Sequence, residues 1–260
     1  MQSLGSSGAL FSGNGNGMNQ EIQQGRGNRL LRVLSREDYL LLEPRLSWCE
    51  LERGQTLVLP DEPIGDAWFP ISGLSSIIAI SGENQGIEVG LIGHEGLIGL
   101  PLLLDCDRTP HRIFMQVGGW GFRIASDELE AVMNASASLR RRLLRFVQVF
   151  NTQITYTALS NTIHTVEERL ARWLLMSHDR QDGDEIPLTH EFLALMLGVR
   201  RPSVTIALHS LEGLGFIRST RGLVTIRRRP ELQEFAGAAY GTPEAEYERL
   251  IGPFRQPDRH

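Results

Sequence analysis

The chain has 260 residues, of which 41% are hydrophobic and 22% charged, and its formal net charge is −5. This length allows one large domain or two ordinary ones, each with its own core. The longest apolar run, from Leu97 to Leu104, is far shorter than the roughly 20 residues that cross a bilayer. The N-terminus also lacks the basic and apolar parts of a signal peptide. We therefore expect a cytoplasmic protein that has no membrane partner.

Two cysteines, Cys49 and Cys106, lie far apart in the sequence. They are too few for a disulfide framework or for an iron–sulfur cluster, which needs about four cysteines. We expect both thiols to be buried or half-buried, as free cysteines usually are. His94, His111 and His164 have no sequence context that marks a haem ligand, so no metal site is predicted.

The first half of the chain is predicted to be a disordered segment followed by a region of β-structure. Residues 1–28 are rich in Gly, Ser, Asn and Gln and are predicted to be disordered. The apolar spacing from Leu30 to about Leu51 predicts helix. Between Gly54 and Ile124, the short runs TLVLP, SSIIAI, IEVGLI and RIFMQV alternate with glycine-containing turns. Short strands at this spacing predict a small β-roll or sandwich, and residues 29–135 are expected to form one domain.

A helical region follows. No Gly or Pro occurs from Ser136 to Ser177, which predicts one long helix or two closely joined helices. An apolar stripe at spacings of three and four runs along its first part and predicts a dimerisation helix over residues 136–163, with a plain core helix as the alternative. The stripe consists of Leu139, Leu143, Phe146, Val147, Phe150 and Ile154.

The next segment has the pattern of a helix-turn-helix. Thr189 is suited to cap a helix that ends at Leu197, Gly198 supplies the turn, and a second helix begins at Arg201-Pro202. Such a unit places its second helix in the major groove of DNA. Apolar side chains of the two helices are expected to pack together. The outward residues expected to contact DNA are Arg200, Arg201, Pro202, Ser203, Thr205, Ile206 and His209.

Local charge supports this prediction. Between Ile186 and Arg229 there are seven arginines and two glutamates, a local charge of 7 − 2 = +5 on an acidic chain. The sequence FIRSTRGLVTIRRR predicts a β-hairpin around Arg221-Gly222, in which Arg221 and Arg228 would contact the DNA backbone. The winged domain is expected to cover residues 164–232, and residues 233–260 are expected to form a flexible tail with a short helix around Ala245 to Leu250.

Residues 30–232 resemble the bacterial Crp/Fnr transcription regulators. The stretches TVEERLARWLLM and IPLTHEFLALMLGVRRPSVTIALHSLEGLGFI carry this resemblance. It implies an α+β fold with an N-terminal cyclic-nucleotide-binding-like roll (a double-stranded β-helix), a long dimerisation helix and a C-terminal winged helix-turn-helix. It also implies a homodimer that binds double-stranded DNA at a two-fold operator through a helix at residues 201–213, with RNA polymerase as a further partner.

Two departures from the family pattern concern specificity. The family's recognition helix typically carries arginine, glutamate and a second arginine, where this chain has Arg201, Pro202 and Ile206. We therefore expect a different operator sequence. Members that bind cyclic nucleotides carry a Gly-Glu and Arg-Ser/Thr-Ala cassette, and the nearest match here is Gly99-Leu100 with Arg108-Thr109-Pro110. Because Leu100 cannot accept hydrogen bonds from a ribose, a cyclic-nucleotide cofactor is disfavoured, and the effector residues would be Gly99, Leu100, Arg108 and Thr109.

Other classes of protein fit less well. A metalloenzyme of the cupin type would need two histidines one residue apart, and the chain contains no such pair. A nucleotide-binding regulatory subunit that acts on a protein partner remains the alternative, although it would have no need of a basic second helix. The sequence therefore predicts a regulator and not an enzyme.

Overall fold

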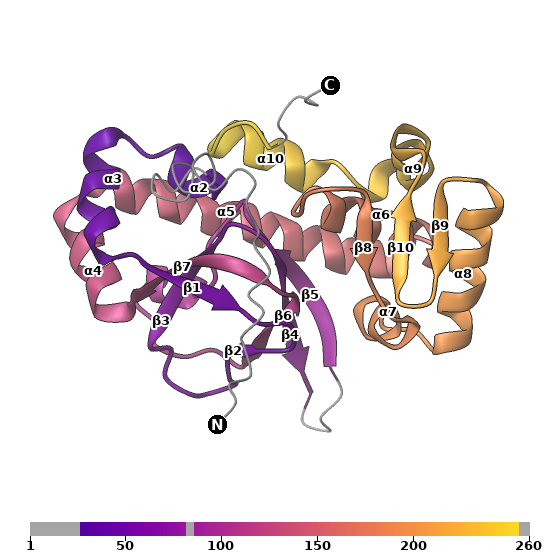
Figure 1. Cartoon of the computed structure of the whole chain (residues 1–260), viewed down its shortest axis with the longest axis horizontal. Coiled ribbons are helices and arrows are strands. Elements are labelled where there is room, and N and C mark those ends of the chain that lie inside the picture. The colour runs from indigo at the N-terminus through magenta and orange to yellow at the C-terminus, as the bar shows by residue number, and fades with distance from the viewer. Residues whose placement is uncertain (1–26, 82–85, 255–260) are drawn as a thin grey trace, which may run out of the picture.

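The computed structural model describes residues 27–81 and 86–254. Most of the segment predicted to be disordered, residues 1–28, lies outside this range. Asn28 does not fit that prediction, because it is buried and its side-chain amide donates hydrogen bonds of 2.8 Å to the carbonyls of Pro70 and Gly96. Figure 1 shows a β-rich half and a helical half, with the long helix α5 running along the β-rich half towards the helical half.

Two antiparallel sheets form the β-rich half, in the strand orders β1-β7-β3 and β2-β6-β4-β5. The four runs predicted from sequence are β2, β4, β5 and β6, which confirms a roll of short strands. Three further strands, β1, β3 and β7, were not predicted. The strands are β1 (Ser47–Leu51), β2 (Thr56–Val58), β3 (Asp66–Pro70), β4 (Leu74–Ile80), β5 (Gly86–Ile92), β6 (His111–Val117) and β7 (Gly119–Ala125).

The helix predicted from Leu30 to Leu51 is broken into shorter pieces. They are α2 (Arg29–Arg32), α3 (Arg36–Leu42) and the 3-10 turn η1 (Glu43–Arg45), and the rest is strand β1. Pro44 lies at the start of η1, where its ring prevents a helix from continuing. Strand β1 then pairs with β7, with Trp48 opposite Phe122. Long-range pairing thus overrides the local helical spacing.

The helical region is a closely joined pair, α5 (Ala137–Ile163) and α6 (Val166–His178), preceded by α4 (Ser126–Ala135). Thr165 and Glu168 form a capping box that starts α6. The apolar stripe on α5 packs within the chain itself, in agreement with the core-helix alternative, and a dimerisation role for α5 stays a prediction. Five of its members, Leu139, Leu143, Phe146, Val147 and Phe150, are buried in the core of the chain's own roll, and Ile154 packs against that core. The stripe therefore holds α5 on the roll and leaves the outward face of α5 largely polar.

The C-terminal half contains a second core around α6. It is built from α7 (His190–Leu197), α8 (Arg201–Gly213) and a three-stranded sheet of order β8-β10-β9. The strands are β8 (Glu185–Pro187), β9 (Ile217–Thr220) and β10 (Leu223–Ile226). This is the predicted helix-turn-helix with its wing, so the fold class expected from sequence is confirmed.

The tail expected at residues 233–260 is ordered in the residues up to 254, and the short helix expected around Ala245 to Leu250 is present. That segment forms α9 (Arg229–Ala236), the turn η3 (Gly237–Ala239) and α10 (Thr242–Leu250). Helix α10 lies along α5 (Figure 1). Its Tyr247 and the following Phe254 are almost fully buried in the core of the roll. These apolar side chains hold the C-terminal segment in place.

The two halves are in direct contact. Phe192 of α7 packs edge-on against Phe114 of β6, with ring centroids 5.9 Å apart. The indole Nε1 of Trp173 in α6 donates a 2.7 Å hydrogen bond to Glu88 of β5. The helix-turn-helix is thus fixed against the edge of the roll that carries β5. No helix in residues 27–81 or 86–254 has the length and apolar character needed to span a membrane.

Candidate nucleic-acid interface

The turn between α7 and α8 is fixed at both ends. Thr189 Oγ1 accepts a 3.2 Å hydrogen bond from the amide of Phe192 and caps α7, as predicted. Gly198 ends α7 with φ +60°, a conformation in which a side chain is unfavourable. The guanidinium of Arg169 in α6 donates a hydrogen bond to the carbonyl of Leu197 and so satisfies the end of α7. The angle at which α8 leaves the turn is therefore set by this framework.

One face of α8 belongs to the core. Val204, Leu208 and Leu211 are buried together with Leu193 and Leu197 of α7, as the apolar pattern predicts. Burying each of these side chains stabilises the fold by about 1.5–3 kcal/mol relative to leaving it exposed to solvent. Because one face of α8 is anchored in this way, the opposite face must point outwards.

The outward face carries the residues predicted to contact DNA. Arg200, Arg201, Pro202, Ile206 and His209 are exposed, and Ser203 and Thr205 are half-buried. Ile206 is 64% exposed, so a β-branched apolar side chain stands in solvent in the middle of this face. Apolar contact with a thymine methyl group is one way in which such a side chain reads a base. In Figure 1, α8 lies at the end of the molecule opposite α4, with its outer side free.

The predicted contact residues are held by neighbours on α7. Arg201 Nη2 lies 2.6 Å from Glu191 Oε1, and Thr205 Oγ1 lies 3.2 Å from His190 Nδ1. Sequence reasoning missed both partners. Their position in the first turn of α7 is a usable signal, because that turn faces the first turns of α8. Glu191 therefore orients the guanidinium of Arg201.

The N-terminus of α8 can accept an anion. Its N-cap is Arg200, which makes no side-chain capping hydrogen bond. Pro202 has no N–H, and the amides of Ser203 and Val204 donate to the carbonyl of Arg200, which leaves the amide of Arg201 for an anion. The helix dipole adds partial positive charge at this end. Backbone amides and arginines at one helix end are suited to binding a phosphate oxygen.

The wing adds further basic side chains. Arg221 is exposed at the turn between β9 and β10, beside Gly222 with φ +77°. Arg228 is more constrained, because its Nε lies 2.8 Å from Glu231 Oε1 and its guanidinium lies over the ring of Phe216. Arg221 is therefore the freer of the two predicted backbone contacts.

The four predicted effector residues lie between β5 and β6. Gly99 has φ +106°, and Leu100 is turned into the core. Arg108 is exposed and pairs with the adjacent Asp107. Thr109 is buried, and its Oγ1 lies 2.7 Å from Nδ1 of His111.

The thiols of Cys49 and Cys106 differ in their exposure to solvent. Cys49 is half-buried, as expected, but Cys106 is exposed, which corrects that prediction. It lies on the loop after the 3-10 turn η2 (Leu100–Leu104), outside the sheets. Across the described ranges, no three His, Cys, Asp or Glu side chains lie close enough to hold a metal ion.

Comparison with known proteins agrees with this geometry. Residues 168–235 match the Crp-like helix-turn-helix domain. No curated relative matches the chain significantly. Among solved structures, FixK2 from Bradyrhizobium japonicum is 16% identical with a TM-score of 0.64, over 75% of this chain and 99% of that one. A CRP-family transcriptional regulator from Thermus thermophilus, TTHB099, is 17% identical with a TM-score of 0.61, over 74% and 98% of the two chains.

A third similar structure is CLP from Xanthomonas campestris, described as a global regulator responsive to c-di-GMP. It is 17% identical with a TM-score of 0.58, over 74% of this chain and 99% of that one. Residues 168–235 thus form a Crp-like helix-turn-helix domain, and the chain has the fold of Crp/Fnr regulators.

Proposed function

We propose that the protein binds a two-fold DNA operator as a homodimer, with one α8 in the major groove of each half-site. The observation that carries this proposal is the outward face of α8, where Arg201, Pro202 and Ile206 are exposed beside an uncapped helix N-terminus. Two such helices related by a two-fold axis would read half-sites about one helical turn apart.

The proposed dimer contact is the outward face of α5. The apolar stripe of this helix is used by the roll, but Leu159 is 43% exposed and Ile163 is 63% exposed near its C-terminal end. Large apolar side chains left in solvent on one helix are suited to meet their copies across a two-fold axis.

In vitro selection from random duplexes with the purified protein tests the proposal. We expect an enriched sequence with two inverted half-sites whose centres are one helical turn apart. Footprinting should then protect both half-sites equally. Enrichment of a single asymmetric half-site, or no enrichment at all, would contradict it.

We also propose that the roll is a sensor whose ligand is not a cyclic nucleotide. The support is the side-chain chemistry around Gly99, since Leu100 is buried where a ribose acceptor would be needed and Arg108 is paired with Asp107. Calorimetric titration with cyclic AMP and cyclic GMP should show no heat of binding. Saturable binding that is abolished by Arg108→Ala would overturn this part of the proposal.

We further propose that the protein acts in the cytoplasm as a transcription regulator and that RNA polymerase is its second macromolecular partner. Transcription in vitro from a selected operator placed upstream of a promoter would test this. A change in transcript level that depends on the position of the operator supports contact with the polymerase. No change at any position would count against it.

A further inference from the structure

The C-terminal segment passes from one half of the molecule to the other. Helix α9 and Tyr240 belong to the core of the DNA-binding half, whereas α10 lies along α5 of the β-rich half (Figure 1). Residues 229–254, which we call the C-terminal strap, therefore contact both halves. Helix α10 lies beyond the Crp-like helix-turn-helix domain, which ends at residue 235.

The first anchor of the strap is on the DNA-binding half. Leu232 and Ala236 of α9 are buried in the core around α6, together with Tyr240. Asp179, which directly follows α6, accepts a 2.7 Å hydrogen bond from Arg229 Nη2 and a second one from the hydroxyl of Tyr240. These contacts fix the strap to the DNA-binding half as far as Tyr240.

The second anchor is on the β-rich half. Tyr247, Ile251 and Phe254 are buried in the core of the roll. The guanidinium groups of Arg29 and Arg180 lie 5.6 Å and 5.3 Å from the centroid of the Phe254 ring. Arg29 belongs to α2 and Arg180 follows α6, so the end of the strap contacts both halves at once.

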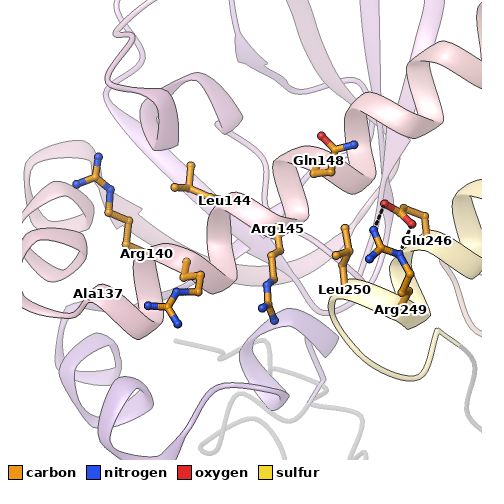
Figure 2. Close-up of a pocket in the computed structure, with 9 residues that line it drawn as sticks. Ala137, Arg140, Leu144, Arg145, Gln148, Glu246, Arg249 and Leu250 are labelled. Carbon is orange, nitrogen blue, oxygen red and sulfur yellow. Dashed lines mark hydrogen bonds and ion pairs between the residues drawn. The ribbon is translucent and has the colours of Figure 1, made fainter.

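Helix α10 attaches to α5 by its inner side and keeps its charged side chains outside. Figure 2 shows Arg249 turned towards Glu246, with which it forms an ion pair of 2.7 Å. Arg142 Nη1 of α5 donates hydrogen bonds of 3.4 Å and 3.1 Å to the carbonyls of Leu250 and Ile251. These bonds satisfy the C-terminal end of α10.

The connection between the two anchors is short. Only Gly241 separates Tyr240 from α10, and its φ is +111°, a conformation in which a side chain is unfavourable. Its amide donates a 3.1 Å hydrogen bond to Glu244 Oε2 and so caps α10. Because fixed residues lie on both sides of Gly241, the strap has no spare length there.

The chain also crosses between the halves where α5 meets α6. His164 and Thr165 have extended backbone between these two helices, and a few such residues are enough to form a hinge. With a second attachment at Gly241, the only rotation that leaves both crossings in place is the one about the line that joins them. Any other rotation of the DNA-binding half would pull α10 out of the core of the roll.

We propose that the C-terminal strap is a positioning element for DNA reading, which holds α8 at a fixed place relative to α5. This inference rests on the proposed binding of a two-fold operator. When one α8 is bound, a rigid connection of matching geometry gives the second α8 a higher effective concentration at its half-site than a loose one. The strap should therefore strengthen binding to two half-sites and narrow the range of half-site spacings that the protein accepts.

The test lengthens the strap without removing any packed side chain. Gly-Ser-Gly-Ser is inserted between Tyr240 and Gly241 of the full chain. The matched control carries the same insertion after Gly183, which lies in an exposed turn of the DNA-binding half with φ +80°. Fluorescence anisotropy is measured with duplexes that carry one half-site, two half-sites, or two half-sites moved apart by one base pair.

We expect the strap insertion to weaken binding to two correctly spaced half-sites at least tenfold and to leave single half-site affinity within twofold of the natural chain. The preference for the correct spacing should also be lost. The control insertion should behave as the natural chain. A second variant, Tyr240→Phe, keeps the ring and removes the hydrogen bond to Asp179, so it should show the same pattern with a smaller loss, of about threefold.

Two results would overturn the inference. One is an unchanged affinity and spacing preference in the strap insertion while circular dichroism shows it to be folded. The other is an equal loss on one and on two half-sites, which would mean that the strap supports the helix-turn-helix itself and not its position. If the natural chain has no preference for two half-sites, the proposed operator binding fails as well. That result is distinguishable, because it needs no variant.

Discussion

Arg180 Nε lies 2.8 Å from Glu95 Oε1, and the two side chains are only 3% and 2% exposed. Arg180 follows α6 in the DNA-binding half, and Glu95 follows β5 in the roll. Each has further partners, since Arg180 also donates to the carbonyl of Met176 and Glu95 accepts from the amide of Gly93. A buried, fully bonded ion pair thus connects the two halves of the molecule.

Removing one member of this pair is expected to be strongly destabilising. Glu95→Ala leaves the guanidinium of Arg180 buried without its carboxylate, which typically costs about 3–5 kcal/mol of unfolding free energy. Urea unfolding measures the loss. The control is Arg45→Ala, which breaks the exposed pair with Glu128 and should cost less than about 1 kcal/mol. Similar losses in the two variants would show that Arg180 and Glu95 do not act as a buried pair.

Glu88 makes stability dependent on pH. Burial raises its pKa to about 8, against the opposing hydrogen bonds from Ser76 and Trp173 and the charges of Arg172 and Arg180. The folded state therefore holds a proton that the unfolded state releases above about pH 4.5. Stability should fall as the pH rises from about 4.5 to 8 and change no further above it, by about 1.4 kcal/mol per unit of pKa difference.

The variant Glu88→Gln isolates this effect, because glutamine keeps an acceptor for Trp173 Nε1 and does not titrate. Its stability relative to the natural chain should increase between pH 5 and pH 8.5, as followed by thermal unfolding. His94 changes stability with pH in the opposite direction, because burial lowers its pKa to about 3. Since His94 is present in both the natural chain and the variant, its contribution cancels in the difference between their stabilities. A difference that is flat with pH would mean that Glu88 is ionised in the folded protein.

Local signals in the sequence were enough for the DNA-binding unit. Thr189, Gly198 and Pro202 define the ends of α7 and α8, and each acts through contacts within a few residues. The hairpin at Arg221-Gly222 is likewise defined by contacts between residues close together in the sequence. Such short-range signals place a motif correctly even without its surroundings.

Long-range contacts explain what the sequence did not predict. The apolar stripe of α5 has the same spacing whether it faces a partner chain or its own roll, and only the fold decides between them. Gln153 is buried because its amide bonds to both the N–H and the carbonyl of Leu91, 62 residues away. The C-terminal segment is polar in composition, and Tyr247 and Phe254 order it through contacts with distant core residues.

Arg201→Ala is expected to relax specificity at one base position of the operator and weaken binding by about 1–3 kcal/mol, because an arginine fork to guanine is lost. Glu191→Ala frees the guanidinium without removing it, so we expect specificity to fall while affinity at low salt is kept or rises. Arg221→Ala should weaken binding to all sequences alike and reduce the salt dependence. Fluorescence anisotropy with operator and base-substituted duplexes measures each effect. Unchanged specificity in Arg201→Ala would contradict the placement of α8 in the major groove.

Substitutions on the outward face of α5 and on its buried face should affect dimerisation and stability differently. Leu159→Glu/Ile163→Glu should shift the protein from dimer to monomer while leaving it folded, because both side chains are exposed. Leu143→Ala, on the buried stripe, should instead cost about 2–5 kcal/mol of stability without changing the monomer–dimer equilibrium. Sedimentation equilibrium and urea unfolding separate the two effects. If Leu143→Ala dissociates the dimer while the protein stays folded, the buried apolar stripe of α5, and not its outward face, is the dimer contact.

Tyr247 tests whether the C-terminal segment is part of the fold. Its side chain is 1% exposed and packs against Phe146 and Phe254, and its hydroxyl donates to the carbonyl of Glu95. Tyr247→Ala removes a buried aromatic side chain and should cost about 3–5 kcal/mol, whereas Tyr247→Phe removes one hydrogen bond and should cost about 1 kcal/mol. Urea unfolding gives both values. Because Tyr247 packs on Phe254 and the guanidinium of Arg180 lies over the Phe254 ring, Tyr247→Ala combined with Glu95→Ala should destabilise by less than the sum of the two single variants. Additive losses would show that α10 and the buried ion pair stabilise the protein independently.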